Sequence, residues 1–229
     1  MPIRFVYFDV DNTLLDHSAA ERAGLQDLHA AHAEAFTGVP VAQLQQTYHA
    51  ASGPLWKQYA EGTIDKAAVK ERRFAHTFGA LGVALDPRAA NAFYMARYAT
   101  HWQAIDGALA AFDAVAAQLP VGIITNGFLE TQRRKLDRFP VLRDRSAAVI
   151  ISEETGVLKP HPRLFAEAAQ RATVAPADIL YVGDSLFSDV EGATRAGWQA
   201  AWYTTATDPV DAPVALRFHD WDTFAAWLL

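Results

Sequence analysis

The stretch Ile3-Arg4-Phe5-Val6-Tyr7-Phe8-Asp9-Val10-Asp11-Asn12-Thr13 decides the fold. Residues 3–8 are rich in β-branched and aromatic side chains and too few for a helical period, so they predict a buried strand. Two aspartates follow at once, two residues apart. In open α/β folds, ligands bind where the carboxyl ends of parallel strands emerge. We therefore expect Asp9 and Asp11 to belong to a ligand-binding site.

The composition is that of a globular protein. The chain has 229 residues, of which 51% are hydrophobic and 20% charged, and its net charge is −6. The acidic balance argues against a nucleic-acid polymer or an acidic membrane surface as a partner. The absence of cysteine excludes a disulfide framework and zinc–thiolate sites. No signal peptide and no long apolar run is visible, so we expect a cytoplasmic protein, with the sequence leaving open whether it is a monomer or a dimer.

The second half of the chain predicts strands and helices in alternation. The expected strands are residues 120–125, 148–152, 179–184 and 199–203, and the expected helices are 129–136, 162–172, 188–196 and 218–229. In the last helix we expect an inner face of Trp221, Phe224, Trp227 and Leu228. Such alternation is typical of a parallel sheet covered by helices, which is an α/β fold.

Residues 18–100 have a different character. They are rich in alanine, glutamine, histidine and glutamate, their apolar residues recur at helical spacing, and glycines punctuate them. This pattern predicts four or more helices and no strand. Because the first strand belongs to the later sheet, we expect residues 1–15 and 105–229 to form one domain, with 16–104 as an all-helical insertion.

Polar groups follow four of the expected strands. Beyond the first strand, the groups are Thr125-Asn126-Gly127, Lys159-Pro160 in a loop, and Gly183-Asp184 with Asp189 five residues beyond Asp184. Closely packed carboxylates raise each other's pKa unless a cation neutralises them, and oxygen ligands favour Mg²⁺. A lysine, a hydroxyl and backbone amides beside such a metal suit a phosphoryl group. The set predicts metal-assisted phosphoryl transfer, with one carboxylate as nucleophile and another as acid and base.

The four motifs, in this order, resemble those of the haloacid dehalogenase superfamily of phosphohydrolases. The match covers essentially the whole chain, and the helical insertion resembles the C1 cap of that family. The resemblance implies a Rossmann-like core with a parallel sheet, and a helical cap domain over residues 16–104.

The resemblance also implies a role for each motif residue. Asp9 would be the nucleophile that forms an aspartyl-phosphate, and Asp11 the general acid that then becomes the base. Thr125, the Asn126 amide and Lys159 would bind the phosphoryl group.

The remaining motif residues would hold the metal or support its neighbours. By the same resemblance, Mg²⁺ would bind the Asp9 carboxylate, the Asp11 backbone carbonyl and the Asp184 carboxylate. Thr13 would orient the Asp11 loop, and Asp189 would hold either the outer shell of the metal or Lys159.

The substrate class depends on the insertion. Residues 53–64, 122–128 and 151–157 are similar to the YjjG-like pyrimidine 5′-nucleotidase branch of the family. Trp56 and Tyr59 are candidates for a platform that stacks a flat base, although such aromatics also pack cap helices together. The alternatives are a phosphatase of a small sugar or acid phosphate such as phosphoglycolate, a phosphomutase, and a catalytically silent binding module. Asp11 argues against a dehalogenase, because a halide leaving group needs no proton.

Two further expectations concern surface and hinges. The basic run Arg133-Arg134-Lys135 is interpreted as a solvated helix face. Residues 16–18 and 104–107 are the expected hinges between the two domains.

Overall fold

The computed structural model describes residues 2–205 and 212–229. The chain divides into two compact units. The core unit comprises Met1–Asp16 with Ala104–Leu229, and the helical unit comprises His17–Gln103.

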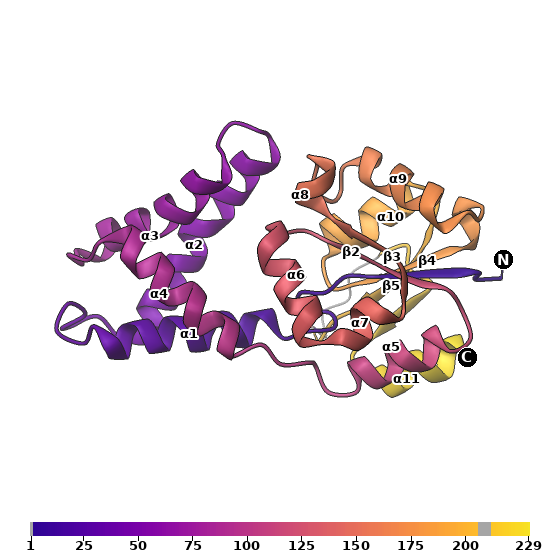
Figure 1. Cartoon of the computed structure of the whole chain (residues 1–229), viewed down its shortest axis with the longest axis horizontal. Helices are drawn as coiled ribbons and strands as arrows, with labels where there is room; N and C mark the ends of the chain where they lie inside the picture. Colours follow the sequence, from indigo (N-terminus) through magenta and orange to yellow (C-terminus); the bar gives the residue numbers. More distant parts are fainter. Residues whose placement is uncertain (1, 206–211) are drawn as a thin grey trace. The chain divides into compact units, whose positions relative to one another are not determined.

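The core unit is built on a six-stranded, fully parallel sheet (Figure 1). The strands are β1 (Phe5–Phe8), β2 (Val121–Thr125), β3 (Ser146–Ile151), β4 (Ile179–Gly183), β5 (Gln199–Tyr203) and β6 (Leu216–Phe218). Their spatial order is β3-β2-β1-β4-β5-β6. The α/β fold with a parallel sheet predicted from the alternating pattern is thereby confirmed.

Side chains alternate between two buried faces of this sheet. On β1, Val6 and Phe8 contribute to one apolar cluster, and Phe5 and Tyr7 to the other, as the period of two in a strand requires. The first face is covered by α5 (Ala108–Ala116), α6 (Leu129–Arg138), α7 (Pro140–Asp144) and α11 (Trp221–Leu228), and the second by α9 (Pro162–Ala172) and α10 (Glu191–Arg195). Among its described residues, the core unit also contains three short helical segments: α8 (Ser152–Thr155), η1 (Pro176–Asp178) and η2 (Leu186–Val190).

The order in which successive strands are added to the sheet reverses beside β1. The chain runs from β1 through β2 to β3 at one edge, and then returns to place β4 on the other side of β1. In open α/β sheets, ligands bind at the carboxyl ends of the strands where this reversal occurs. Asp9 follows β1 and Asp184 follows β4, so these two aspartates flank the reversal.

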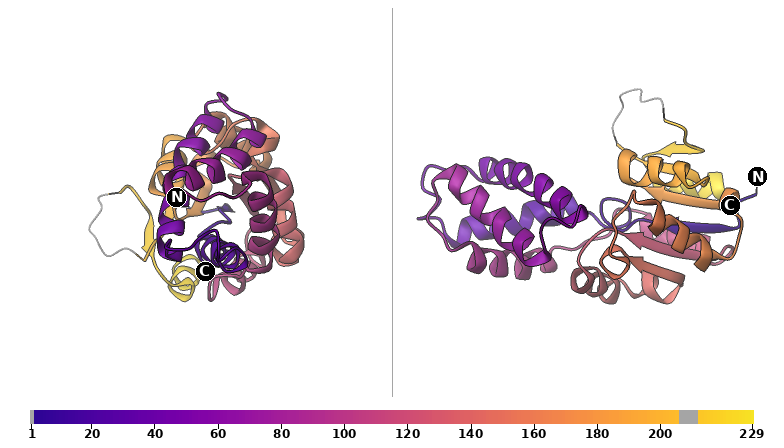
Figure 2. Two further views of the ribbon diagram at one scale, coloured as in Figure 1. Left: turned by 90° about the vertical axis from the view of Figure 1, so that its left-hand side faces the viewer. Right: turned by 90° about the horizontal axis from the view of Figure 1, so that it is seen from above.

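The helical unit contains helices and no strand, as expected (Figure 2). Its helices are α1 (His17–Ala31), α2 (Val41–Ala60), α3 (Lys66–Leu81) and α4 (Pro87–Thr100). Tyr48, Phe74 and Tyr94 pack with ring centroids 5.1–5.6 Å apart. The buried Arg73 guanidinium lies 5.3 Å from the Tyr94 ring centre and donates a 2.6 Å hydrogen bond to Asn91. These side chains therefore form the interior of the helical unit.

The C-terminal segment differs from the sequence-based expectation. The predicted helix over 218–229 was wrong in its start, because Leu216–Phe218 pairs in parallel with β5 as a sixth strand. The helix begins at Trp221. Asp220 caps its first turn, because its side chain accepts a 2.8 Å hydrogen bond from the Thr223 amide. Trp227 is 39% exposed rather than buried. A strand of three residues is too short to produce a readable sequence pattern.

The predicted helix over 188–196 is also observed in a different form. A π-helical turn, η2, precedes the short helix α10. The Ser185 hydroxyl caps this turn by accepting a hydrogen bond from the Ser188 amide.

Within the described residues, the structure has no helix of the length and apolarity needed to cross a membrane.

A substitution at Gly122 tests how tightly the centre of the sheet is packed. A Cβ atom at this position would lie 2.4 Å from Tyr7 Cε1 and 2.9 Å from the carbonyl oxygen of Ala148. We expect Gly122→Ala to lower the free energy of unfolding by about 1–3 kcal/mol, measured by urea denaturation, because overpacking strains a close-packed core. The control is Gly79→Ala in α3, where the added Cβ meets no atom within 4 Å. Equal losses in both variants would contradict the packing argument.

Candidate active site

Lys159 occupies the centre of the site. Its Nζ lies 2.7 Å from Asp9 Oδ1 and 2.8 Å from Asp189 Oδ1, and it donates a 2.8 Å hydrogen bond to the Tyr181 hydroxyl. That hydroxyl in turn donates to the carbonyl oxygen of Ile124 at 2.9 Å. The lysine side chain is only 2% exposed. The ammonium thus lies among two carboxylates and one hydroxyl.

Burial and the neighbouring charges together leave the pKa values of Asp9, Lys159 and Asp184 above their ordinary values. Burial raises the pKa of Asp9 well above its usual range, the Lys159 ammonium opposes that rise, and Asp189 and Asp184 add to it. For Lys159, burial lowers the pKa, but the two carboxylates Asp189 and Asp9 outweigh this and hold the pKa well above its ordinary value. Burial, followed by repulsion from Asp189, raises the pKa of Asp184 to about 6.

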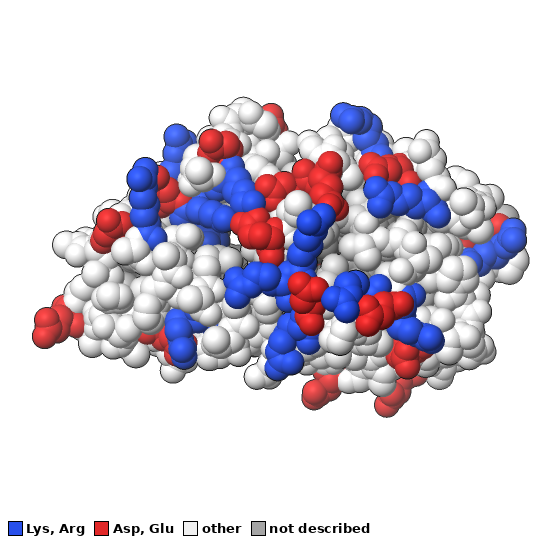
Figure 3. Space-filling view, viewed as in Figure 1, with Lys and Arg blue, Asp and Glu red and all other residues white. Residues whose placement is uncertain are grey.

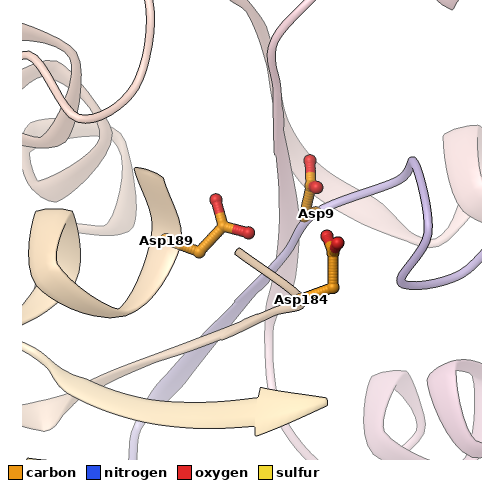
Figure 4. Close-up of side chains that lie close together, drawn as sticks. All are labelled: Asp9, Asp184 and Asp189. Atoms are coloured by element: carbon orange, nitrogen blue, oxygen red, sulfur yellow. The ribbon is translucent and has the colours of Figure 1, made fainter. Parts of the chain in front are cut away.

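Three carboxylates converge at the carboxyl ends of β1 and β4. Ligand oxygens of Asp9, Asp184 and Asp189 all lie within 4.8 Å of one another, and Figure 4 shows the three side chains directed at a common space. When ionised, the three carboxylates exceed the one ammonium of Lys159 by two negative charges. Oxygen-only donors with this charge fit a hard divalent cation such as Mg²⁺.

The loop after β4 holds Asp189 by hydrogen bonds and close packing. The Ser185 amide donates to Asp189 Oδ2 at 3.0 Å, and the Ser188 hydroxyl donates to Oδ1 at 3.1 Å. A Cβ on Gly183 would lie 2.4 Å from Asp189 Oδ2. Only glycine at position 183 therefore leaves room for this carboxylate.

Asp184 is oriented from two other elements. The Thr13 hydroxyl donates to Asp184 Oδ1 at 3.2 Å, so Thr13 contacts a carboxylate of the acidic cluster. The Trp202 indole donates to the carbonyl oxygen of Asp184 at 2.8 Å. Both the side chain and the main chain of Asp184 are thereby held.

Asp11 does not join the acidic cluster through its side chain. Gln132 Nε2 donates to its Oδ2 at 2.8 Å, and Lys135 Nζ lies 2.5 Å from its Oδ1.

The interpretation of Lys135 as part of a solvated face was wrong, since its side chain is 2% exposed and paired with Asp11. The helical spacing of Gln132, Lys135 and Leu136 could have indicated this burial, because it places all three on the buried side of α6. Arg133 fits the expectation, because its side chain is 61% exposed.

The end of β2 lies beside Lys159. The Asn126 side chain accepts from the Lys159 amide at 2.8 Å and donates to its carbonyl oxygen at 3.1 Å. The Asn126 side chain is therefore used to hold the lysine backbone. The preceding Thr125 is fully buried. Sequence reasoning did not identify Tyr181, Gln132 or Lys135, since these residues belong to no motif and meet the site only in the folded chain.

Trp56 and Tyr59 lie near the end of α2 in the helical unit. Both are half-buried, and their rings meet edge-on with centroids 5.8 Å apart. They lie three positions apart on the same helix as Tyr48. Both are less enclosed than Tyr48, which is buried in the interior of the helical unit.

Comparison with known proteins agrees with this geometry. Residues 3–197 match the model of the haloacid dehalogenase-like hydrolase family. The chain is 32% identical over 199 residues to the pyrimidine 5′-nucleotidase YjjG of Escherichia coli, covering 86% of this chain and 84% of that protein. It is 31% identical over 234 residues to the phosphoserine phosphatase of Thermus thermophilus, covering 91% and 92% of the two chains.

A solved structure extends the likeness to the whole fold. The HAD-hydrolase YfnB of Bacillus subtilis, bound to magnesium, superposes with a TM-score of 0.82 at 26% identity. The match covers 100% of this chain and 99% of that one. The family model, the related sequences and the shared fold lead to one conclusion: this chain belongs to the haloacid dehalogenase-like hydrolase family.

Proposed function

We propose that this protein is a Mg²⁺-dependent phosphomonoester hydrolase that works through an aspartyl-phosphate on Asp9. The observation that carries the proposal is the buried Lys159 ammonium held 2.7 Å from Asp9, with Asp184 and Asp189 beside it. A carboxylate kept in place by an ammonium, next to further oxygen ligands, suits attack on a phosphoryl group. The relatives named as phosphatases and a nucleotidase support the same reaction.

The proposed reaction has two steps. In the first, an Asp9 carboxylate oxygen bonds to phosphorus, the bond from phosphorus to the ester oxygen breaks, and the Asp11 carboxyl gives its proton to the leaving alcohol. In the second, water gives a proton to Asp11 and bonds to phosphorus, the bond to Asp9 breaks, and phosphate leaves. Asp11 serves both steps because the first leaves it ionised for the second.

The other groups bind and orient the phosphoryl group. Lys159 balances charge between that group and Asp9. Thr125 and the Asn126 backbone amide bind phosphoryl oxygens, while the Asn126 side chain keeps the Lys159 backbone in place. Asp9, the Asp11 backbone carbonyl and Asp184 would hold Mg²⁺, and Asp189, which lies 2.8 Å from Lys159 Nζ, would support both the metal site and the lysine. Bound Mg²⁺ supplies charge neutralisation for phosphoryl oxygens.

The proposed substrate is a pyrimidine nucleoside 5′-monophosphate. Similarity to the nucleotidase YjjG over 86% of this chain supports this class. Residues 16–104 would act as a cap, with Trp56 and Tyr59 as substrate contacts and residues 16–18 and 104–107 as hinges. On the core side, the two connecting segments are joined by a 3.0 Å hydrogen bond from the Ile105 amide to the Leu14 carbonyl oxygen.

A small phosphorylated acid or sugar is the second candidate class. The phosphoserine phosphatase of Thermus thermophilus, similar over 91% of this chain, favours it.

On the face shown in Figure 3, basic and acidic side chains are intermingled rather than gathered into one basic patch. Together with the net charge of −6, this supports a small substrate rather than a nucleic-acid polymer.

Replacing the nucleophile tests the mechanism. We expect Asp9→Asn to lower phosphate release by at least roughly 10³-fold, because the amide cannot form the acyl phosphate. Release is measured with the metal-loaded protein on an active monophosphate. The control is Asp137→Asn, which changes the same side chain at an exposed position on α6. Retained turnover in Asp9→Asn would contradict the assigned mechanism.

Cation binding is expected to depend on pH. The folded-state pKa of Asp184 is about 6, above its ordinary value of 3.8. Between these values the cation-free folded protein holds more protons than the unfolded chain, so its stability falls as pH rises through this window. Mg²⁺ competes with protons for the same carboxylates and relieves their repulsion.

Thermal unfolding with and without Mg²⁺ measures this linkage. The rise in unfolding temperature on adding Mg²⁺ should be larger at about pH 8 than at about pH 5. In Asp184→Asn the Mg²⁺-induced rise should shrink at both pH values. An equal rise at both pH values in the unaltered protein would show that these carboxylates do not hold the cation.

A substrate panel separates the two candidate classes. Phosphate release is measured with dUMP, dTMP, UMP, phosphoserine, phosphoglycolate and hexose phosphates. We expect the highest kcat/KM for the pyrimidine monophosphates. A preference for phosphoserine or phosphoglycolate would instead assign the small-acid class.

A further inference from the structure

We propose that Lys135 and Gln132 are positioning residues, which hold the Asp11 carboxylate in the orientation needed to pass a proton to and from the reacting oxygens. The inference rests on the proposed phosphatase function. It assigns a task to two residues of α6 that lie outside all four motifs.

The contacts fix both oxygens of the carboxylate. Gln132 Nε2 donates to Asp11 Oδ2 at 2.8 Å, and Lys135 Nζ contacts Oδ1 at 2.5 Å. One donor on each oxygen restrains rotation about the last side-chain bond of Asp11, which a single donor would leave free. Reacting groups must be held within a fraction of an ångström for efficient proton transfer.

Burial of the donors argues for positioning rather than for stability. The Lys135 side chain is 2% exposed and Gln132 is 3% exposed, whereas the Asp11 side chain is 22% exposed. Both donors therefore approach from the protein interior, and the carboxylate retains an accessible side. Desolvating an ammonium offsets much of the attraction in such a pair, so a buried ion pair contributes little net stability.

The same network connects Asp11 to the phosphate-binding lysine. Gln132 Nε2 also donates to the carbonyl oxygen of Asn126 at 3.1 Å, and the Asn126 side chain holds the backbone of Lys159. A Cβ on Gly127 would lie 2.5 Å from Gln132 Nε2, so glycine at position 127 leaves space for this arrangement. Gln132 therefore sets the position of Asp11 relative to Lys159, which contacts Asp9.

A neighbouring cation on the same helix provides a matched control. Arg133 is 61% exposed and pairs with Glu154 at 2.7 Å. Arg133→Met removes one positive charge from α6, as Lys135→Met does, but does not touch Asp11. Gln132→Met removes the amide donor without changing charge.

The test measures how strongly the rate depends on the leaving group. The probes are 4-nitrophenyl phosphate, phenyl phosphate and benzyl phosphate, which are similar in shape but release oxyanions of increasing basicity. Only a basic leaving oxygen needs the proton of Asp11. The quantity compared is kcat/KM with Mg²⁺ present, because it reports on steps up to the first irreversible phosphoryl transfer.

We expect Lys135→Met and Gln132→Met to lose roughly 10- to 100-fold in kcat/KM on benzyl phosphate. The loss on 4-nitrophenyl phosphate should be smaller by about tenfold, since its leaving group needs little protonation. Arg133→Met should keep the leaving-group dependence of the unaltered protein. A merely structural role would lower all three rates by the same factor.

The outcomes separate the inference from the proposed function. Equal losses across the three esters, or no loss, would overturn the positioning role while leaving the phosphatase function intact. If the unaltered protein released no phosphate from these esters or from the nucleotide panel, the proposed function would fail and the inference with it. If Lys135→Met did not fold, as judged by circular dichroism, Gln132→Met would decide the question.

Discussion

The ammonium of Lys159, buried between Asp9 and Asp189, is the interaction on which the site depends. It lies 2.7 and 2.8 Å from the two carboxylates, in surroundings where an unpaired charge would be strongly unfavourable. Three carboxylates with one ammonium leave a deficit of positive charge. A divalent cation would supply the missing positive charge and, together with the ammonium, would attract a negatively charged phosphoryl group.

The fold supplies this arrangement through the reversal of strand order beside β1. Asp9 from β1 and Asp184 from β4 come together there, although 175 positions separate them along the printed sequence. Glycine at position 183 gives Asp189 the space that a Cβ would fill. A second, separate pairing holds Asp11 to Lys135 and Gln132. Two carboxylates of one short motif are therefore placed in different electrostatic surroundings, which suits different roles in a reaction.

The sheet, the family and the motif residues could be predicted from the sequence, because short apolar strands and acidic strand ends leave clear local patterns. It did not reveal β6, whose three residues are recognisable only beside β5. The burial of Lys135 was also missed, because a basic run predicts a solvated face unless its partner is known. Tyr181 escaped notice for a related reason: in the sequence it is one apolar residue of a strand, and only the fold places its hydroxyl against Lys159.

Trapping the covalent intermediate tests the central claim most directly. The metal-loaded protein is mixed with an active monophosphate, quenched in acid within the first turnover, digested and analysed by mass spectrometry. A peptide containing Asp9 should carry one added phosphoryl group, and its amount should rise and then decay as phosphate is released. A phosphoryl group on another residue, or turnover without any phosphorylated peptide, would contradict the role of Asp9 as nucleophile.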